Sequence, residues 1–149
     1  MFSQPGVKAV VLLIGINDIS WPGTDFAPDQ MRPTPDQMIA GYRQVIELAR
    51  ANNIRLIGAT LPPFKGALSG TPLENYYHQD KDALRQEVNR WIRESGAFDA
   101  IADFDAVLRD PEHPTRLIPA FDSGDHLHPG DVGNRAMAEA IDLDALLGR

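Results

Sequence analysis

The chain alternates between short apolar runs and longer amphipathic segments, and this alternation predicts its secondary structure. The first apolar run, residues 9–14, holds six consecutive apolar residues and ends at Gly15. A continuous apolar run is typical of a parallel strand that is buried on both faces. Residues 54–61 and 98–104 are further strand-like segments. We therefore expect three buried strands.

Amphipathic segments follow each of these strands. The first begins at Thr34, which is followed by a proline and, three residues later, by Gln37. An N-cap, a first-turn proline and a capping-box glutamine together predict the start of a helix. A second helix is expected around residues 84–92, with Gly96 as its left-handed C-terminal cap. A third is expected to begin near Pro129.

The resulting order, β-α-β-α-β-α, predicts an α/β fold with a parallel sheet, right-handed crossovers and helices packed on the sheet. A chain of 149 residues is the size of one domain, so we expect a single domain over residues 1–149. In such sheets ligands bind beyond the carboxyl ends of the strands. Two polar stretches are expected there: GIND at 15–18 and DHLH at 125–128.

Composition narrows the classes of function. A net charge of −7, with 14 scattered basic residues, disfavours a nucleic-acid partner. The absence of cysteine excludes a disulfide framework, a thiolate metal site and a cysteine nucleophile. No apolar run approaches the roughly 20 residues of a membrane-spanning helix, so none is expected. The opening MFSQPG lacks the basic start of a secretory signal, and the localisation stays unknown.

Asp125 and His128 are spaced so that the carboxylate can hold one imidazole nitrogen while the other nitrogen faces a substrate. If Pro129 is the first residue of the last helix, the helix dipole disfavours the imidazolium and Asp125 offsets this effect. His128 is then suited to act as a general base. The alternative is a helix-capping histidine beside a solvated turn acid.

Asn17 is the candidate oxyanion donor. Its side-chain amide can donate a hydrogen bond into the same crevice, where it would stabilise a developing negative charge. The alternative is a turn asparagine, because Asn-Asp pairs after strands often bond their own backbone.

Taken together, strand-G-x-N-D and D-x-x-H-P resemble the third and fifth sequence blocks of the GDSL or SGNH hydrolases. The segment GDHLHPGDVGNRAMAEAID at 124–142 is similar to the block that closes GDSL-type lipases and esterases. The resemblance implies a three-layer α/β/α flavodoxin-like sandwich that hydrolyses small-molecule acyl esters through a serine, without a cofactor or metal. By this match Gly15 is the third-block glycine, Asn17 the oxyanion donor, Asp125 the orienting acid and His128 the general base.

The sequence departs from the family at the nucleophile. No serine follows Gly-Asp, and the glycine of the family's second block is also absent. The resemblance begins at the family's third strand, which implies a truncated fold and weak or no hydrolysis by this chain alone. Ser20, three residues after Asn17, is a weak candidate nucleophile, and Ser123 is a weaker one. Another copy of the chain is a further possible source.

Two other functions remain open. The chain is alternatively a non-catalytic binding module. A divalent-metal site is the second alternative, because the loop and the helix start are rich in suitable ligands. Its candidate ligands are Asp122, Asp125, His126, His128 and Asp131. Aromatic residues that either line an acyl or sugar pocket or pack in the core are Trp21, Phe26, Phe64, Tyr76 and Tyr77.

The resemblance also predicts self-association. In the family's sheet, ordered 2-1-3-4-5, the missing strands would cover one side of the strand at 9–14. Without them this strand becomes an apolar edge, with Lys8 as the nearest charge. Exposed edges of this kind pair readily with other chains. We expect a homodimer or a higher assembly through residues 9–14.

Overall fold

Three parallel strands form one sheet in the order β1-β2-β3 in the computed structural model, which describes residues 4–149. The strands are β1 (Ala9–Leu12), β2 (Arg55–Ala59) and β3 (Ala100–Ala102). β1 pairs with β2 from Ala9 opposite Arg55, and β2 pairs with β3 from Ile57 opposite Ala100. Within residues 4–149, no strand pairs with the outer side of β1, so it is an edge strand as expected. The N-terminal residues up to Ser3 lie outside the described part.

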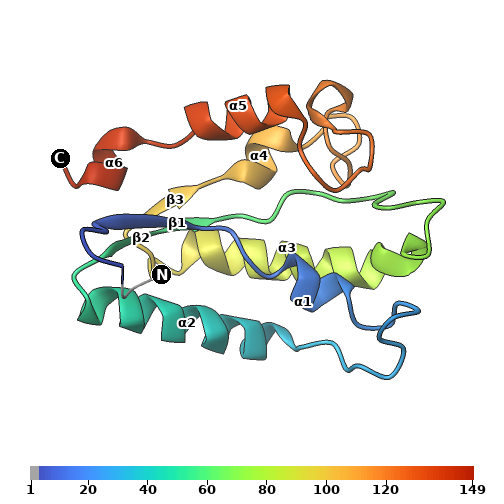
Figure 1. The fold of residues 1–149 in the computed structure, drawn as a ribbon, viewed down its shortest axis with the longest axis horizontal. Helices are drawn as coiled ribbons and strands as arrows, with labels where there is room; N and C mark the ends of the chain where they lie inside the picture. The colour runs from blue at the N-terminus through green and yellow to red at the C-terminus, as the bar shows by residue number, and fades with distance from the viewer. Residues whose placement is uncertain (1–3) are drawn as a thin grey trace.

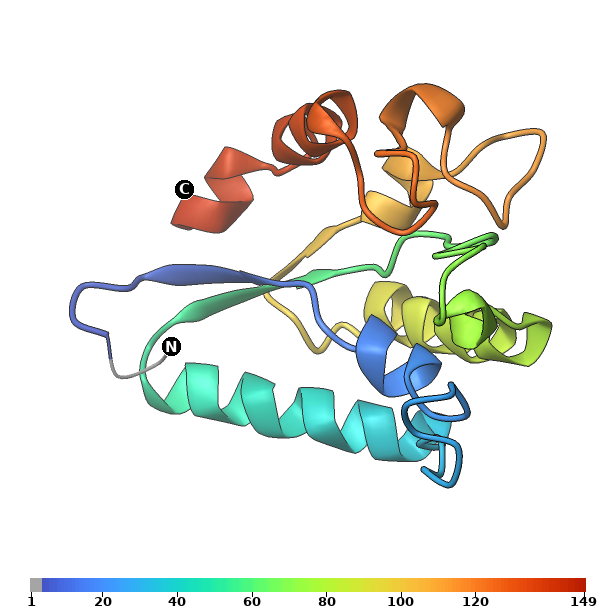
Figure 2. The ribbon, with the colours of Figure 1, turned by 45° about the vertical axis from the view of Figure 1, so that its right-hand side comes forward.

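Helices cover both faces of this sheet (Figures 1 and 2). The α-helices are α1 (Ile16–Ser20), α2 (Pro35–Ala51), α3 (Gln79–Glu94), α4 (Phe104–Leu108), α5 (Asp131–Glu139) and α6 (Leu143–Leu147), and the 3-10 helices are η1 (Glu74–Tyr76) and η2 (Pro119–Phe121). α1, α2 and α3 lie on one side, and α4, α5 and α6 lie on the other. The predicted three-layer α/β/α arrangement is confirmed. None of the described helices is long and apolar enough to cross a membrane.

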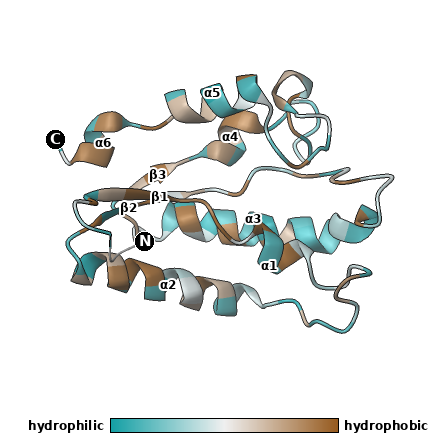
Figure 3. Ribbon diagram, viewed as in Figure 1, coloured by the Kyte–Doolittle hydropathy of each residue, from teal (hydrophilic) through white to brown (hydrophobic). Residues whose placement is uncertain are grey.

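Alternate side chains of β2 build two separate cores. Leu56 packs into a cluster with residues of α2 and α3, such as Ile46 and Val88. Ile57 faces the other way and packs in a cluster that includes Met137 of α5. Because successive side chains of a strand point to opposite faces, one apolar run supplies both layers. Figure 3 shows β1 as a similarly hydrophobic strand.

The predicted caps of the two long helices are confirmed. The Thr34 hydroxyl accepts a hydrogen bond from the Gln37 N–H at 3.2 Å, and the Gln37 side chain accepts one from the Thr34 N–H at 2.9 Å. This capping box starts α2. α3 ends at Glu94, and Gly96 follows its cap residue with a φ of 62°. Only glycine adopts this left-handed conformation without strain.

The strands are shorter than predicted, because a helical turn begins soon after β1 and β3. Residues 13 and 14 were predicted in the first strand, but β1 ends at Leu12 and Ile14 is 49 % exposed. β3 ends at Ala102 because Asp103 caps α4, its side chain accepting a hydrogen bond from the Ala106 N–H. Asp103 signals the start of α4 as a polar cap, and a pattern of hydrophobic positions alone does not reveal it.

The helix expected near Pro129 is α5, which the short helix α6 follows. It begins at Asp131, so Pro129 is not its first residue. Pro129 instead forms an isolated bridge with Asp122, and the N–H of Gly130 donates to the Phe121 carbonyl at 2.7 Å. These contacts hold the residues before α5 in an extended conformation. His128 therefore lies in the loop, and the helix-dipole argument does not apply to it.

A buried polar network fixes the segment that leaves β2. Asn89 of α3 accepts a hydrogen bond from the Leu61 N–H at 2.7 Å and donates one to the Leu61 carbonyl at 2.8 Å. Arg85, which is 1 % exposed, donates to the same carbonyl and is paired with Asp82 and Asp105. Buried backbone groups are costly unless they find partners, so these side chains hold the chain in place beside the site.

Candidate active site

A cavity of about 270 Å³ lies at the carboxyl end of the sheet, where the turn after β1 meets the loop before α5. Asn17 and His128, which are 111 positions apart in the sequence, both line it. Most of the other lining residues are apolar, among them Leu61 and Met137. The cavity is therefore a largely apolar pocket with a small number of polar groups, which is typical of small-molecule sites.

Asp125 and His128 form a hydrogen-bonded pair, with 2.6 Å between the Asp125 Oδ2 and the His128 Nδ1. The other oxygen of Asp125 accepts hydrogen bonds from the backbone N–H groups of Leu127 and His128 and from the Ser123 hydroxyl. Burial alone raises the pKa of the Asp125 carboxyl, but these hydrogen bonds outweigh it and hold the pKa below its usual range. Asp125 is therefore a carboxylate at neutral pH.

The loop geometry leaves one nitrogen of His128 available. Its Nδ1 is held by Asp125, so Nε2 is the ring nitrogen that remains for another partner. The His128 side chain is 68 % exposed. Its backbone carbonyl accepts a hydrogen bond from the Ser123 N–H at 3.0 Å, which closes the loop around Asp125. This is the arrangement that a general base requires.

Asn17, in the first turn of α1, is oriented by Tyr76. The Tyr76 hydroxyl donates to the Asn17 Oδ1 at 2.5 Å. Because Oδ1 is engaged as an acceptor, the Asn17 amide N–H₂ is left to donate. Burial, together with the negative charge of Asp18, raises the pKa of Tyr76 to about 12, so its hydroxyl stays protonated at neutral pH. The sequence marked Tyr76 only as an aromatic; no local motif signals this role.

Gly15 shapes the turn that presents Asn17. Its φ is 116°, and a Cβ there would lie 2.9 Å from the Tyr42 hydroxyl and 3.0 Å from the Met38 Cε. The Tyr42 hydroxyl in turn donates to the Ile14 carbonyl at 2.6 Å. Gly15 is not among the residues that line the cavity, so its part is to allow the close approach of α2 to this turn.

No serine is among the described residues that line the cavity. Ser20, the weak candidate nucleophile, is completely buried in α1, and its hydroxyl is not accessible to a substrate. Ser123 donates to Asp125 at 3.0 Å, so it supports the acid and is not directed at His128. The structure thus brings together three of the predicted site residues, Asn17, Asp125 and His128, without a nucleophile.

The proposed metal ligands are not gathered into one site. His126 pairs with Asp122, with 2.5 Å between Nδ1 and Oδ2, and His128 pairs separately with Asp125. No group of three or more His, Asp or Glu side chains within residues 4–149 is arranged to hold a metal ion. The divalent-metal hypothesis is therefore not supported by the geometry of this loop.

The aromatic candidates have different environments. Tyr76 lines the cavity of Asn17 and His128, and Tyr77 lines a second cavity. Phe64 is buried between them, with ring centroids 6.3 Å and 5.1 Å from those of Tyr76 and Tyr77. Trp21 and Phe26 stack on each other near the surface, 5.9 Å apart. Of the five, Tyr76 is the one that reaches the candidate active site.

Similar folds occur among solved hydrolase structures. A GDSL-like lipase from Bacteroides thetaiotaomicron is 18 % identical, with a TM-score of 0.67, over 95 % of this chain and 63 % of that structure. An acetylxylan esterase from Geobacillus stearothermophilus is 20 % identical, with a TM-score of 0.56, over 95 % of this chain and 60 % of that one. The chain thus spans about three fifths of the length of these structures, whose likeness shows the fold.

The family assignment comes from the sequence profile. No curated protein is significantly similar to the chain in sequence. The profile of the GDSL-like lipase/acylhydrolase family, however, matches residues 2–141. This match covers nearly the whole chain and includes both the turn of Asn17 and the loop of Asp125 and His128. The chain therefore belongs to the GDSL-like lipase/acylhydrolase family.

Proposed function

We propose that this chain carries the acid–base pair and one oxyanion donor of an active site that hydrolyses small acyl esters. The observation that carries the proposal is the shared cavity: His128, held by Asp125 at 2.6 Å, and Asn17, held by Tyr76, line the same pocket. The base acts on the attacking hydroxyl and the oxyanion donor acts on the carbonyl oxygen, so both must reach one reacting centre. Family membership supports the ester as substrate class.

In this proposal His128 takes a proton through Nε2 from the attacking hydroxyl, and later returns it to the leaving alcohol. The carboxylate of Asp125 stabilises the imidazolium that forms between these two steps. The Asn17 amide donates to the carbonyl oxygen as it gains negative charge. The surrounding apolar lining strengthens this hydrogen bond, because it lowers the local dielectric.

The attacking hydroxyl is the missing part. No serine of the described residues lines the cavity, so in this proposal residues 4–149 do not supply the nucleophile. Members of a triad act as a unit, and removal of the serine alone removes most of the rate. We therefore expect weak hydrolysis by this chain alone.

The test is the hydrolysis of p-nitrophenyl acetate with a matched pair of histidine variants. His128→Ala is expected to abolish whatever turnover the chain shows. His78→Ala is the control, because His78 is an exposed histidine whose Nδ1 also lies 2.6 Å from a carboxylate, that of Asp80, but outside the cavity. Equal loss in both variants, or no loss in His128→Ala, would contradict the proposed role.

The second candidate is a non-catalytic binding module, which the absence of a serine from the cavity lining favours. The two candidates differ in one measurement. A module binds a short acyl ester without releasing nitrophenol above the buffer rate, and His128→Ala then changes affinity alone. An esterase site releases product, and the release depends on His128.

A further inference from the structure

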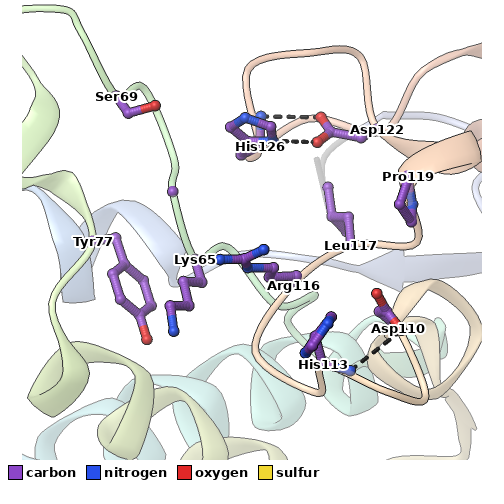
Figure 4. A pocket seen from close by; sticks show the side chains of 11 residues that line it. Lys65, Ser69, Tyr77, Asp110, His113, Arg116, Leu117, Pro119, Asp122 and His126 are labelled. Atoms are coloured by element: carbon purple, nitrogen blue, oxygen red, sulfur yellow. Dashed lines mark hydrogen bonds and ion pairs between the residues drawn. The ribbon is translucent and has the colours of Figure 1, made fainter.

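A second and larger cavity, of about 550 Å³, lies on the other side of the loop that carries His128. Figure 4 shows its lining, which comes from three loops around residues 65–77, 110–119 and 122–126. The polar side chains that matter for its chemistry are Lys65, Tyr77, Asp110, His113, Arg116 and Asp122. None of these belongs to the cavity of Asn17 and His128.

The two carboxylates in this lining already have donors. Asp110 accepts hydrogen bonds from the backbone N–H groups of Glu112 and His113. Asp122 accepts from the N–H groups of Gly124 and His126 through one oxygen, and it pairs with the His126 ring through the other. Asp122 is therefore satisfied through both oxygens, whereas among the described residues Asp110 uses Oδ1 alone and keeps Oδ2 free.

The two strong cations in the lining are not satisfied in this way. Within residues 4–149, neither Lys65 nor Arg116 pairs with a carboxylate or donates a side-chain hydrogen bond. The hydroxyl of Tyr77 also has no bonded partner among these residues. The unused hydrogen-bonding capacity of the cavity thus includes three donors, two of them positively charged, beside the free Oδ2 of Asp110.

The walls of the cavity are fixed by backbone hydrogen bonds. The Lys65 N–H donates to the Thr115 carbonyl at 2.9 Å, which ties the first loop to the second. The Leu68 N–H donates to the Asp125 carbonyl at 2.9 Å, which ties the first loop to the third. A Cβ on Gly66 would lie 3.4 Å from the His126 ring, so the loops also pack closely. The cations are presented by a joined set of loops.

We propose that this cavity binds a carboxylate, with Lys65 and Arg116 as its charged donors. A planar guanidinium matches the two oxygens of a carboxylate, and a lysine adds a point charge that adapts to them. Tyr77 supplies a neutral donor beside them. Lys65 and Arg116 are exposed cations without a protein partner among residues 4–149, so together they provide the positive charge for an acidic ligand.

The cavity adjoins the candidate active site through shared loops. Tyr76 lines one cavity and its neighbour Tyr77 lines the other. His126 and His128 are likewise divided between the two cavities, and their Cα atoms are at most about 7 Å apart by chain length. The next step rests on the proposed function: we assign the carboxylate to the ester substrate itself. The preferred substrate is then an ester that also carries a carboxylate group.

Binding of D-glucuronate, with D-glucose as its neutral counterpart and inorganic phosphate as a second anion, tests this proposal by calorimetry. Glucuronate is expected to bind at least about tenfold more tightly than glucose, as charge-assisted hydrogen bonds require. The Lys65→Gln/Arg116→Gln variant should lose that difference. Lys8→Gln/Arg90→Gln is the matched control, because both residues are exposed and lie outside the cavity.

Equal affinities for glucuronate and glucose, or an unchanged affinity in the Lys65→Gln/Arg116→Gln variant, would overturn the proposal. Phosphate binding as tight as that of glucuronate would overturn the carboxylate assignment. His128→Ala separates this proposal from the function, since it should leave glucuronate affinity unchanged. Glucuronate binding without ester turnover would reject the proposed function alone, and turnover without binding would reject the carboxylate site alone.

Discussion

The Tyr76 hydroxyl donates a hydrogen bond to the Asn17 Oδ1 at 2.5 Å, joining the start of α1 to η1. Tyr76 is 2 % exposed, so the side chain that orients the amide is itself held by packing against Phe64. An oxyanion donor is effective only when it is oriented in advance of the reaction. Tyr76 is therefore a positioning residue for Asn17.

Tyr76→Phe should lower kcat with little change in KM, because the ring remains and only the hydroxyl is removed. The loss should be smaller than that of Asn17→Ala, for which about 10²- to 10³-fold is expected of an oxyanion donor. Kinetics on p-nitrophenyl acetate measure the two losses. An unchanged kcat in Tyr76→Phe, or a raised KM alone, would contradict a positioning role for Tyr76.

Asp125→Asn should lower the melting temperature at neutral pH, and the difference from the unmodified protein should shrink in acid. The folded-state pKa of Asp125 lies below the value of about 3.9 in unfolded chains. Its contribution to stability is thus fully present above about pH 4 and is lost as the pH falls through the folded-state pKa. Thermal melts between pH 7 and pH 2.5 follow this change. A constant difference across the range would contradict it.

Gly15→Ala should destabilise the protein, whereas Gly41→Ala should not. At Gly15 an alanine is strained by the φ of 116°, and its Cβ would lie 2.9 Å from the Tyr42 hydroxyl. We expect a cost of about 1–3 kcal/mol. Gly41 lies in α2 with nothing within 4 Å of an added Cβ, so alanine should stabilise the helix by about 0.5–1 kcal/mol. Urea denaturation compares the two, and an equal effect would count against the strain at Gly15.

Asn89→Leu should cost about 1–3 kcal/mol, because it leaves the buried N–H of Leu61 without an acceptor. The Leu61 carbonyl keeps its hydrogen bond from Arg85, so one group and not two is orphaned. Asn52→Leu is the control, since the Asn52 side chain is exposed and bonds only the Leu48 carbonyl. Denaturant unfolding should show a large loss in the first variant and a small one in the second.

Most of the architecture was predictable from local patterns. Apolar runs predicted the three strands, and the capping box at Thr34 and the glycine at position 96 predicted helix ends that the structure confirms. The differences lie at the ends of elements, where single contacts decide the conformation. Pro129 pairs with Asp122 two residues before α5 begins, and neither residue carries a local signal for that bridge.

The candidate site was predictable only in part, for the same reason. The spacing of Asp125 and His128 is local, so the sequence predicted their pair, which the structure shows at 2.6 Å. The support of Asn17 by Tyr76 joins residues 59 positions apart, and no periodicity or motif encodes it. The tertiary fold also brings Lys65 and Arg116, two cations without a partner in the described part of the chain, into one cavity, and no local pattern in the sequence predicts this.

The final prediction concerns self-association, which we propose takes place through β1. This strand lies at the edge of the sheet with its outer side unpaired among residues 4–149. The Arg55 N–H donates to the Lys8 carbonyl, so the backbone groups of Lys8 point toward β2. Backbone groups alternate sides along a strand, so those of Val10 also point toward β2 and those of Val11 point outward. Unpaired groups on an apolar edge form a ready template for a second copy of the same strand.

Val11→Pro tests this pairing, because proline removes one outward N–H donor and is tolerated on an edge strand. We expect a dimer in which two copies of β1 pair antiparallel, and Val11→Pro should convert it to a monomer that keeps the native circular dichroism. Val10→Pro is the control, since it breaks the bond to β2 and should unfold the chain instead. Light scattering at micromolar concentration distinguishes these states. A monomeric unmodified protein, or an assembly that Val11→Pro leaves intact, would show that β1 does not mediate association.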